Sequence, residues 1–325
     1  MTTLITGGAG FVGLNIAREL LQSGEKVVIF DLGQISPAAF VDFQCADGLL
    51  EVVCASVLSS SDLAQALRAH QIDRIVHGAA ITASLEREKA SAKEIVEVNT
   101  LGTINVLECA IAAGVSRTVC LGTGSVFGPT VSNQTGLLDE TADLPQPETL
   151  YGISKFAAER IALRYRQTRG IDLTVARLGV VFGRYEHDTG LRDTMSAPLV
   201  LGQLALRSEH AKVYRHLPDD WVYATDVARV VKQLLDTKTP IGPLYQIATG
   251  APWSVEDWCQ RLANAFPDFT YELVDTQEAA NVGRITPNRR PCFSIERLRN
   301  DIQYEPYFTA QRAFEDYVTW LETMA

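Results

Sequence analysis

The chain has 325 residues and a net charge of −10, with 46% hydrophobic and 21% charged residues. This balance predicts a well-buried core, and the length suits one large α/β domain with a smaller one attached. The acidic charge and the absence of a lysine/arginine block exclude nucleic acid and anionic membrane surfaces as expected partners. The N-terminus enters a strand pattern directly and no apolar run reaches membrane-span length, so we expect a cytoplasmic protein without a signal peptide.

The six cysteines show no paired CxxC spacing, which fits a reducing compartment. Three of them lie in apolar runs and are expected to be buried free thiols: Cys54, Cys109 and Cys120. His187, His210 and His216 have no metal-ligand spacing with other histidines or cysteines, so no metal site is expected.

Short apolar runs alternate with longer helical patterns through the first half of the chain. The predicted strands are Thr2–Thr6, Lys26–Asp31, Glu51–Cys54, Arg74–His77, Thr118–Leu121 and Leu173–Arg177. The predicted helices are Phe11–Gln22, Ser61–Ala69, Lys89–Ala113 and Tyr151–Thr168. Strands that are apolar throughout are typical of a parallel sheet covered on both faces, so the pattern predicts a doubly wound α/β (Rossmann-type) fold.

The second half of the chain is more polar and more often interrupted by proline and glycine. We expect a Rossmann domain over 1–182 and a smaller, C-terminal substrate-binding lobe made mainly of 183–217 and 250–325. Residues 218–249 are expected to return to the sheet, through a helix Thr225–Leu235 with Thr225 as its N-cap and a strand Leu244–Ile247.

A glycine-rich turn connects the first predicted strand to the first helix. Gly7, Gly10 and Gly13 would let backbone N–H groups and a helix N-terminus approach a pyrophosphate. Asp31 ends the second strand, where a carboxylate accepts the adenosine ribose hydroxyls and repels a 2′-phosphate, which favours NAD over NADP. The alternatives are glycines needed only for a tight turn and an acidic helix cap or loop residue at Asp31.

Tyr151 and Lys155 lie four residues apart on a predicted helix and therefore share a face. A neighbouring ammonium favours the phenolate form of a tyrosine, which then exchanges a proton with an alcohol while hydride moves to or from a cofactor. Such a pair is also common on solvated helix surfaces. Thr123 lies 28 residues before Tyr151, in a glycine-rich segment that follows an apolar strand.

Together these motifs resemble the extended short-chain dehydrogenase/reductases, the NAD-dependent sugar epimerase/dehydratase family. The segments that carry the resemblance extend over nearly the whole chain: Gly7–Gly13, Asp31, His77–Ala80, Val98–Gly102, Thr123–Gly128, Tyr151/Lys155 and Trp221–Ala228. The resemblance implies hydride and proton transfer at a secondary alcohol, with Thr123 orienting the substrate oxygen.

The resemblance also assigns supporting residues. Asn99 would support the active-site geometry, unless it is a helix residue bonded to nearby backbone; His77 is expected to be packed rather than catalytic. The remaining cofactor contacts would be Phe11, Val12, Ser56, Val57, Ala79, Ala80, Ile81, Asn99, Tyr151, Lys155 and Leu178, with Lys155 holding the nicotinamide ribose. Substrate contacts are expected at Thr82 and Ser125.

Three departures from the family pattern narrow the chemistry. Gly124 and Ser125 stand where sugar 4,6-dehydratases carry an acidic pair, so dehydration is not expected. Asp219 replaces an arginine that meets the diphosphate of a nucleotide sugar, and Val180 replaces an asparagine. Both changes favour a free sugar or sugar acid, although Arg215 is near enough to substitute for the missing arginine.

Arginines in two polar segments are candidate substrate ligands. Arg184, Arg192 and Arg290 could each pair with a carboxylate or phosphate of a small polyhydroxy substrate. The alternative is a solvated loop in which arginines pair with nearby Asp and Glu residues.

The reaction outcome stays open between a dehydrogenase, which releases NADH, and an epimerase, which returns the hydride to the opposite face. A nucleotide-diphosphate-sugar 4-epimerase is the next alternative, and a non-catalytic NAD-sensing regulator is a third. The resemblance implies a homodimer formed through the helices Lys89–Ala113 and Tyr151–Thr168.

Overall fold

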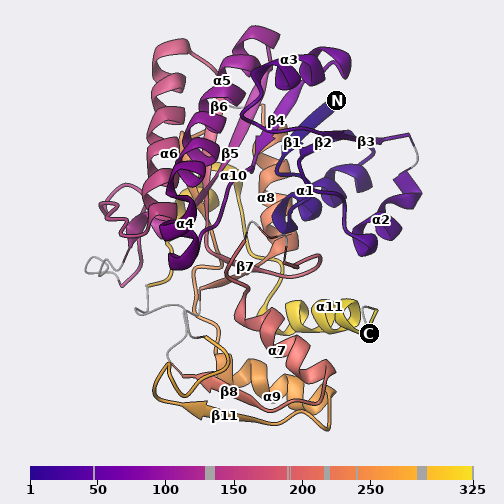
Figure 1. Ribbon diagram of the computed structural model, residues 1–325, viewed down its shortest axis with the longest axis vertical. Coiled ribbons are helices and arrows are strands. Elements are labelled where there is room, and N and C mark those ends of the chain that lie inside the picture. Colours follow the sequence, from indigo (N-terminus) through magenta and orange to yellow (C-terminus); the bar gives the residue numbers. More distant parts are fainter. Residues whose placement is uncertain are drawn as a thin grey trace.

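The computed structural model describes residues 1–46, 48–128, 136–188, 190, 192–215, 220–238, 241–283 and 291–323. A seven-stranded sheet forms the larger part of the molecule (Figure 1). Its strands are β1 (Thr2–Thr6), β2 (Lys26–Asp31), β3 (Leu50–Cys54), β4 (Arg74–His77), β5 (Arg117–Thr123), β6 (Leu173–Leu178) and β10 (Leu244–Ile247). Their spatial order is β10-β6-β5-β4-β1-β2-β3, and every neighbouring pair is parallel. This is the predicted doubly wound sheet, whose order reverses between β1 and β4.

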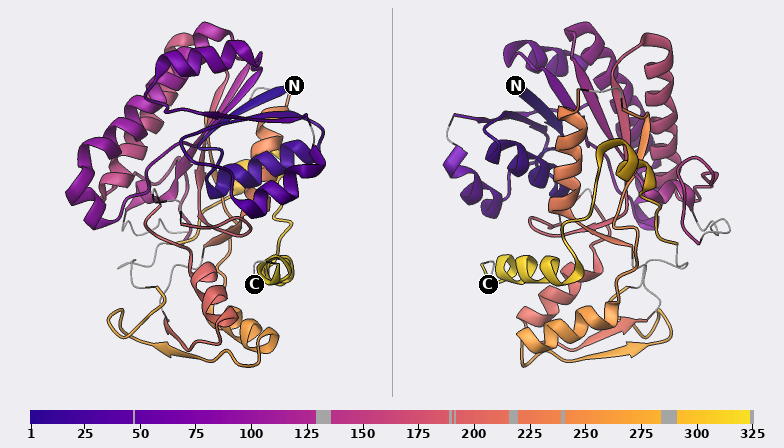
Figure 2. Two further views of the ribbon diagram at one scale, coloured as in Figure 1. Left: turned by 45° about the vertical axis from the view of Figure 1, so that its right-hand side comes forward. Right: turned by 180° about the vertical axis from the view of Figure 1, so that it is seen from behind.

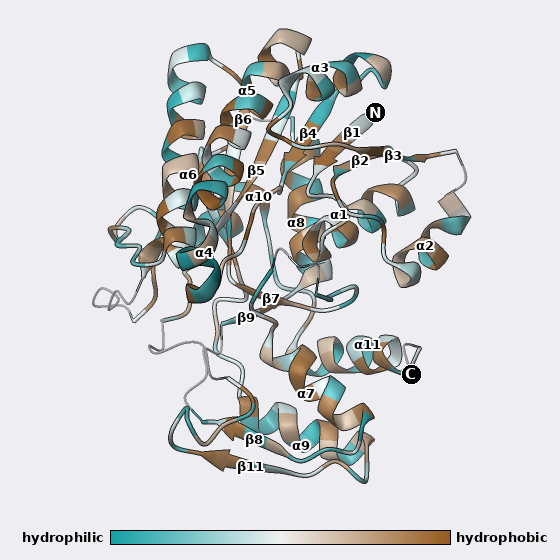
Figure 3. Cartoon of the chain, in the orientation of Figure 1, coloured by the Kyte–Doolittle hydropathy of each residue, from teal (hydrophilic) through white to brown (hydrophobic). Residues whose placement is uncertain are grey.

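Helices cover both faces of this sheet (Figure 2). One face carries α1 (Phe11–Gln22), α2 (Pro37–Phe43), α8 (Ala224–Asp236) and α10 (Glu296–Ile302); the other carries α3 (Ser60–Ala69), α4 (Leu85–Val96), α5 (Gly102–Ala113) and α6 (Leu150–Arg169). In Figure 3 the strands are mostly hydrophobic, whereas the helices carry both kinds of residue. Strands with both faces covered need apolar side chains on both.

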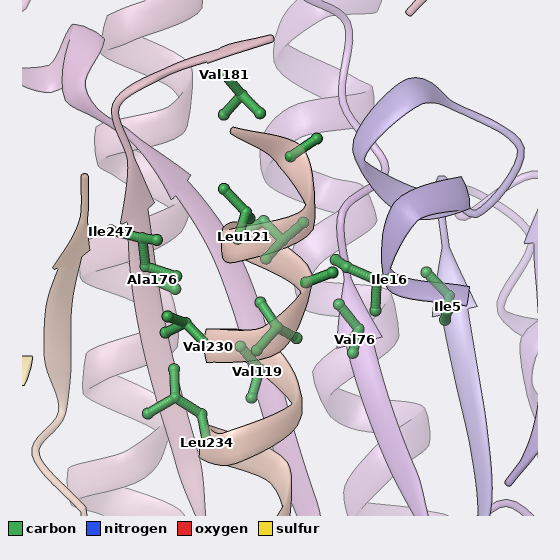
Figure 4. Close-up of a cluster of buried hydrophobic side chains, with 14 of the residues drawn as sticks. Ile5, Ile16, Val76, Val119, Leu121, Ala176, Val181, Val230, Leu234 and Ile247 are labelled. Carbon is green, nitrogen blue, oxygen red and sulfur yellow. The ribbon is translucent and has the colours of Figure 1, made fainter. Parts of the chain in front are cut away.

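The core beneath α8 shows how the helices are held. Val230 and Leu234 of α8 lie over Val119 of β5 and Ala176 of β6 (Figure 4), and all four side chains are fully buried. Burying each valine or leucine contributes about 1.5–3 kcal/mol. Residues far along the chain thus complete the Rossmann core.

The smaller lobe lies beyond the carboxyl ends of the strands. It contains β8 (Ala211–Tyr214), β11 (Tyr271–Val274), α7 (Ala197–Leu206), α9 (Val255–Ala265) and α11 (Ala310–Glu322), and the pair β7 (Val180–Phe182) and β9 (Trp221–Tyr223) joins it to the sheet. Phe182 is the centre of its aromatic core, with ring centroids of Tyr223 and Trp258 5.2 Å away. Edge-to-face contacts of this kind stabilise beyond their buried area.

Most predicted elements are confirmed, and three local expectations are wrong. The helix predicted from 89 to 113 begins at Leu85 and is interrupted by a π-helical turn, Glu97–Leu101, before α5. Thr225 is not an N-cap, because β9 leads directly into α8 and Tyr223 occupies that position without a side-chain cap. Cys54 is exposed because β3 is an edge strand, whereas Cys109 and Cys120 are buried.

Candidate active site

A cavity of about 740 Å³ opens at the carboxyl ends of the strands, where the sheet order reverses. Its wall contains most of the residues predicted from the sequence: Gly7, Gly10, Phe11, Val12, Gly13, Asp31, Ser56, Val57, Ala79, Ala80, Ile81, Thr82, Thr123, Ser125, Tyr151, Leu178 and Arg192. Lys155, Asn99 and Arg184 are not in this wall, and Arg290 lies outside the described residues.

The glycine turn leaves no room for side chains. Gly7 has φ +69°, and a Cβ there would lie 2.7 Å from the backbone nitrogen of Ala79; a Cβ on Gly13 would lie 2.3 Å from the carbonyl oxygen of Gly7. Gly10 is the N-cap of α1 and has no side-chain cap, so the first N–H groups of the helix are available to an anion. These features fit a dinucleotide pyrophosphate.

The Asp31 carboxylate is tied to the same turn. Its two oxygens accept hydrogen bonds from the backbone N–H of Ala9 at 3.0 Å and of Gly33 at 2.9 Å. Carboxylate oxygens have further lone pairs, so Asp31 can still accept from ribose hydroxyls. Val57, expected beside the adenine, packs against Gly102, where a Cβ would lie 2.7 Å from Val57 Cγ2.

Thr123 and Tyr151 reach the cavity from adjacent elements. Thr123 is the last residue of β5, and its Oγ1 accepts from the N–H of Ser125 at 3.1 Å and donates to Ser125 Oγ at 3.2 Å. Tyr151 lies in the first turn of α6, capped by Thr149. The fold therefore brings Thr123, Ser125 and Tyr151 to one cavity.

Lys155 lies one turn further along α6, beneath the cavity wall. Its Nζ is buried and donates to the carbonyl oxygen of Leu121 at 2.8 Å. Burial lowers the pKa of Lys155 to about 8, while Cys120 and Glu159 favour the charged form.

Asn99 lies in the π-helical turn and is fully hydrogen-bonded. Its Oδ1 accepts from the N–H of Ile81 at 2.8 Å, and its Nδ2 donates to Ile81 O at 3.1 Å and Ser154 Oγ at 3.0 Å. Asn99 thus holds the wall residue Ile81 from behind rather than lining the cavity.

Arg184 is removed from the substrate site. Its Nε donates to Asp316 of α11 at 2.9 Å, its backbone carbonyl accepts from Asn15 of α1, and it is absent from the described wall. Arg184 is thus held by a residue of α11, neither by a substrate group nor by a neighbour within its own loop. Arg215 likewise pairs with Asp275 outside the wall.

Arg192 lines the cavity from a segment we call the strap, the described residues among 186–196. Its guanidinium lies over the Phe11 ring at 5.1 Å, donates from Nε to Thr194 O at 3.0 Å and pairs with the buried Glu186 at 2.8 Å. Asp193 accepts from Arg87 Nε at 2.8 Å. These contacts hold the described residues of the strap at the cavity wall.

The cavity wall also contains residues that the sequence reasoning did not assign: Glu94, Glu148, His187 and Thr194. The Nδ1 of His187 is 2.8 Å from Tyr185 O, which accepts, so Nδ1 carries the proton and Nε2 remains available. Glu148 could have been found from its place just before Tyr151. Glu94 offers no sequence signal, since it resembles any other charge on a helix.

The fold and the glycine turn place this protein among the Rossmann-type dinucleotide-binding proteins. A family model described as the NAD dependent epimerase/dehydratase family matches residues 3–248, and the chain belongs to that family. NAD is its cofactor, and the glycine turn and Asp31 fit it.

Known proteins of this family differ in activity. The chain is 24% identical over 99% of its length to a dTDP-glucose 4,6-dehydratase of Xanthomonas campestris pv. campestris (strain B100), covering 93% of that protein. It is 29% identical over 92% of its length to sterol demethylase protein B of Methylococcus capsulatus, covering 88% of it. The structure of UDP-glucose 4-epimerase from Thermus thermophilus in complex with NAD matches with a TM-score of 0.80 and 21% identity, over 100% of both chains.

Proposed function

We propose that this protein catalyses NAD-dependent hydride and proton transfer at a secondary alcohol of a sugar or sugar-derived substrate. One observation carries the proposal. Thr123 and Tyr151 line the same cavity as the glycine turn, so a substrate held by them would meet a bound dinucleotide.

Each residue has a distinct role in this proposal. NAD, when bound, accepts or returns a hydride. Tyr151 takes the proton from the substrate hydroxyl and gives it back in the reverse direction. The charged Lys155 favours the phenolate of Tyr151 and holds the nicotinamide ribose, and Thr123 orients the substrate oxygen.

Elimination of water is not part of the proposed reaction. Gly124 and Ser125 follow Thr123 in a 3-10 turn, and neither supplies the carboxylate that a dehydratase of this family has there. The Ser125 hydroxyl instead accepts a hydrogen bond from Thr123 Oγ1, which in turn accepts from the backbone N–H of Ser125. We infer that Ser125 helps to hold the substrate oxygen.

The charges of the wall favour a substrate without a nucleotide. Among described wall residues Arg192 is the single arginine or lysine, against Asp31, Glu94 and Glu148. A second diphosphate would meet net negative charge and the apolar Val180. Arg192 suits one carboxylate, so we propose a sugar acid. The unprotonated Nε2 of His187 would accept a hydrogen bond from one of its hydroxyls.

A nucleotide-diphosphate-sugar 4-epimerase is the second candidate. The likeness to the Thermus epimerase favours it, and Arg289 and Arg290 lie outside the described residues. Replacing both arginines with glutamine separates the two candidates. The sugar-acid proposal expects unchanged NAD binding and a KM within about twofold of the parent value. If the substrate is a nucleotide sugar, its KM should rise at least about tenfold.

Cofactor content decides between an epimerase and a dehydrogenase. Freshly purified protein is denatured and the released nucleotide is measured. Near-stoichiometric NAD that survives gel filtration supports an epimerase, which recycles its cofactor. Empty protein that binds added NAD reversibly supports a dehydrogenase. Protein that binds no NAD contradicts the proposal in both forms.

We propose a homodimer formed by α4, the π-helical turn and α6. Val96, Leu101 and Ile153 are exposed by 41%, 48% and 46% on these elements. The helical run Leu85–Ala113 is also long and apolar enough to span a membrane, but helices that bury two faces have the same composition. Ile153→Glu should give a monomer by light scattering, and an unchanged mass contradicts the proposed interface.

A further inference from the structure

A continuous line of buried hydrogen bonds runs from the end of β1 to the start of α6. His77 Nδ1 lies 2.7 Å from Thr6 Oγ1, and its Nε2 lies 2.9 Å from Thr103 Oγ1. Thr103 Oγ1 donates to Asn99 O at 2.8 Å, and Asn99 Nδ2 donates to Ser154 Oγ at 3.0 Å. All five residues are at most 2% exposed. The sheet and the helices that cover one of its faces are therefore joined through His77.

The direction of these bonds determines the tautomer of His77. The single hydroxyl proton of Thr103 is used on Asn99 O, so Thr103 Oγ1 accepts from Nε2–H of His77. In the neutral ring Nδ1 is then an acceptor, and Thr6 donates to it. Thr6 Oγ1 also accepts from the N–H of Ala79 at 3.4 Å, which agrees with this direction.

The surroundings of His77 favour the neutral ring as well. Full burial, together with the nearby positive charge of Lys155, lowers the pKa of His77 to about 3. A protonated ring would donate from both nitrogens and reverse the Thr6 bond. The bond directions and the burial therefore both indicate a neutral His77 ring.

The far end of this line supports the cofactor wall. Asn99 holds both backbone groups of Ile81, and Ser154 donates to Tyr151 O at 3.0 Å. Ile81 and Ala79 both line the cavity. A shift of the Thr103–Asn99 turn would therefore move the wall and the first turn of α6 together.

We propose that His77, held as the neutral Nε2–H tautomer, is a positioning residue that sets the NAD-binding wall through Thr103 and Asn99. The alternative is that His77 only fills the core. In that case NAD affinity changes no more than it does after an equally destabilising change elsewhere.

Nitrogen NMR of protein labelled with ¹⁵N-histidine tests the tautomer, with the His77 signals assigned from their loss in His77→Gln. We expect a protonated Nε2, an unprotonated Nδ1 and no titration between about pH 5 and 9. A protonated Nδ1, or titration within this range, overturns the tautomer and with it the proposed line of bonds.

NAD affinity tests the positioning role without any substrate, so a failure here is separate from a failure of the proposed reaction. Thr103→Val removes the acceptor of His77 and should weaken NAD binding about tenfold. Thr103→Ser retains the hydroxyl, so its NAD affinity should be within about twofold of the parent protein's. Both are measured by calorimetry.

The matched control is Thr174→Val. Thr174 is a fully buried threonine at the start of β6, away from the cavity, and its hydroxyl donates to Gly242 O at 2.9 Å. The Thr174→Val variant should lose about as much stability as Thr103→Val but keep the NAD affinity of the parent protein. Equal NAD affinities for Thr103→Val and Thr174→Val would show that His77 is only a core residue and would overturn the proposal.

Discussion

The two halves of the cavity are built in different ways. The nucleotide half is made of strand ends and backbone, with Gly7 and Gly13 packed so closely that a Cβ would overlap neighbouring main chain. The half that we propose for the substrate depends on side chains of the strap, where Arg192 is held by Glu186 and Asp193 by Arg87. Backbone geometry tolerates little change, whereas a strap held by ion pairs can be altered residue by residue. We infer that cofactor choice is the constrained property and substrate choice the adjustable one.

The largest effect is expected where the two halves meet. Tyr151→Phe removes the proposed acid/base and should lower turnover about 10³-fold. NAD affinity should stay within about twofold, because phenylalanine keeps the aromatic ring that lines the cavity and removes only the hydroxyl. Steady-state kinetics and calorimetry on the same preparation check both numbers, and retained turnover removes Tyr151 from the mechanism.

In the nucleotide half, Gly13→Ala should weaken NAD binding about a hundredfold, because the new Cβ collides with the carbonyl of Gly7. Gly24→Ala is the control. Gly24 also has a positive φ, +78°, but nothing lies within 4 Å of a Cβ there. The control should lose about 1 kcal/mol of stability and bind NAD normally. Equal NAD affinities for the two variants would contradict the crowded-turn account.

In the substrate half, Arg192→Met should raise KM for a sugar acid about tenfold and leave NAD affinity unchanged. Glu186 keeps its hydrogen bonds to the N–H and hydroxyl of Ser196 in this variant. Arg184→Met, which breaks the pair with Asp316 outside the cavity, is the control and should leave KM unchanged. An unchanged KM in Arg192→Met together with a raised KM in Arg184→Met would contradict the assignment of Arg192 to the substrate.

The smallest effect is expected at the strap's attachment. Asp193→Asn weakens the pair with Arg87 and should raise KM about threefold. The hydrogen bond from Arg87 lowers the pKa of Asp193 to about 2. The Asp193–Arg87 ion pair therefore holds the strap above pH 4, and it is lost as the pH falls towards 2 and Asp193 becomes protonated. Asp188→Asn, at an exposed carboxylate that accepts from Gly190 N, is the control. A KM change that varies between pH 5 and 9 would contradict this assignment.

The same comparison explains what the sequence could predict. Strand ends, glycine spacing and the Tyr151/Lys155 pair are local patterns, and local patterns determine the nucleotide half. The wall residues Gly7, Asp31 and Thr123 were therefore found without a structure.

The remaining features depend on contacts between distant residues. Arg184 and Arg192 look alike in the sequence, but Asp316, far along the chain, holds one outside the cavity, while Glu186 and Phe11 hold the other within it. Cys54 lies in an apolar run but is exposed, because the strand order leaves β3 at the edge. No local pattern carries either fact.

The most direct test of the account is a substrate panel with NAD supplied and Tyr151→Phe as the blank. The panel pairs sugar acids with their matching neutral sugars and with nucleotide-diphosphate sugars, and both NADH and epimer formation are measured. We predict turnover of a sugar acid that disappears in the blank, with weaker use of the neutral sugar. Turnover of a nucleotide sugar, with every free sugar acid inert, would contradict the assignment of Arg192 and the substrate class proposed here.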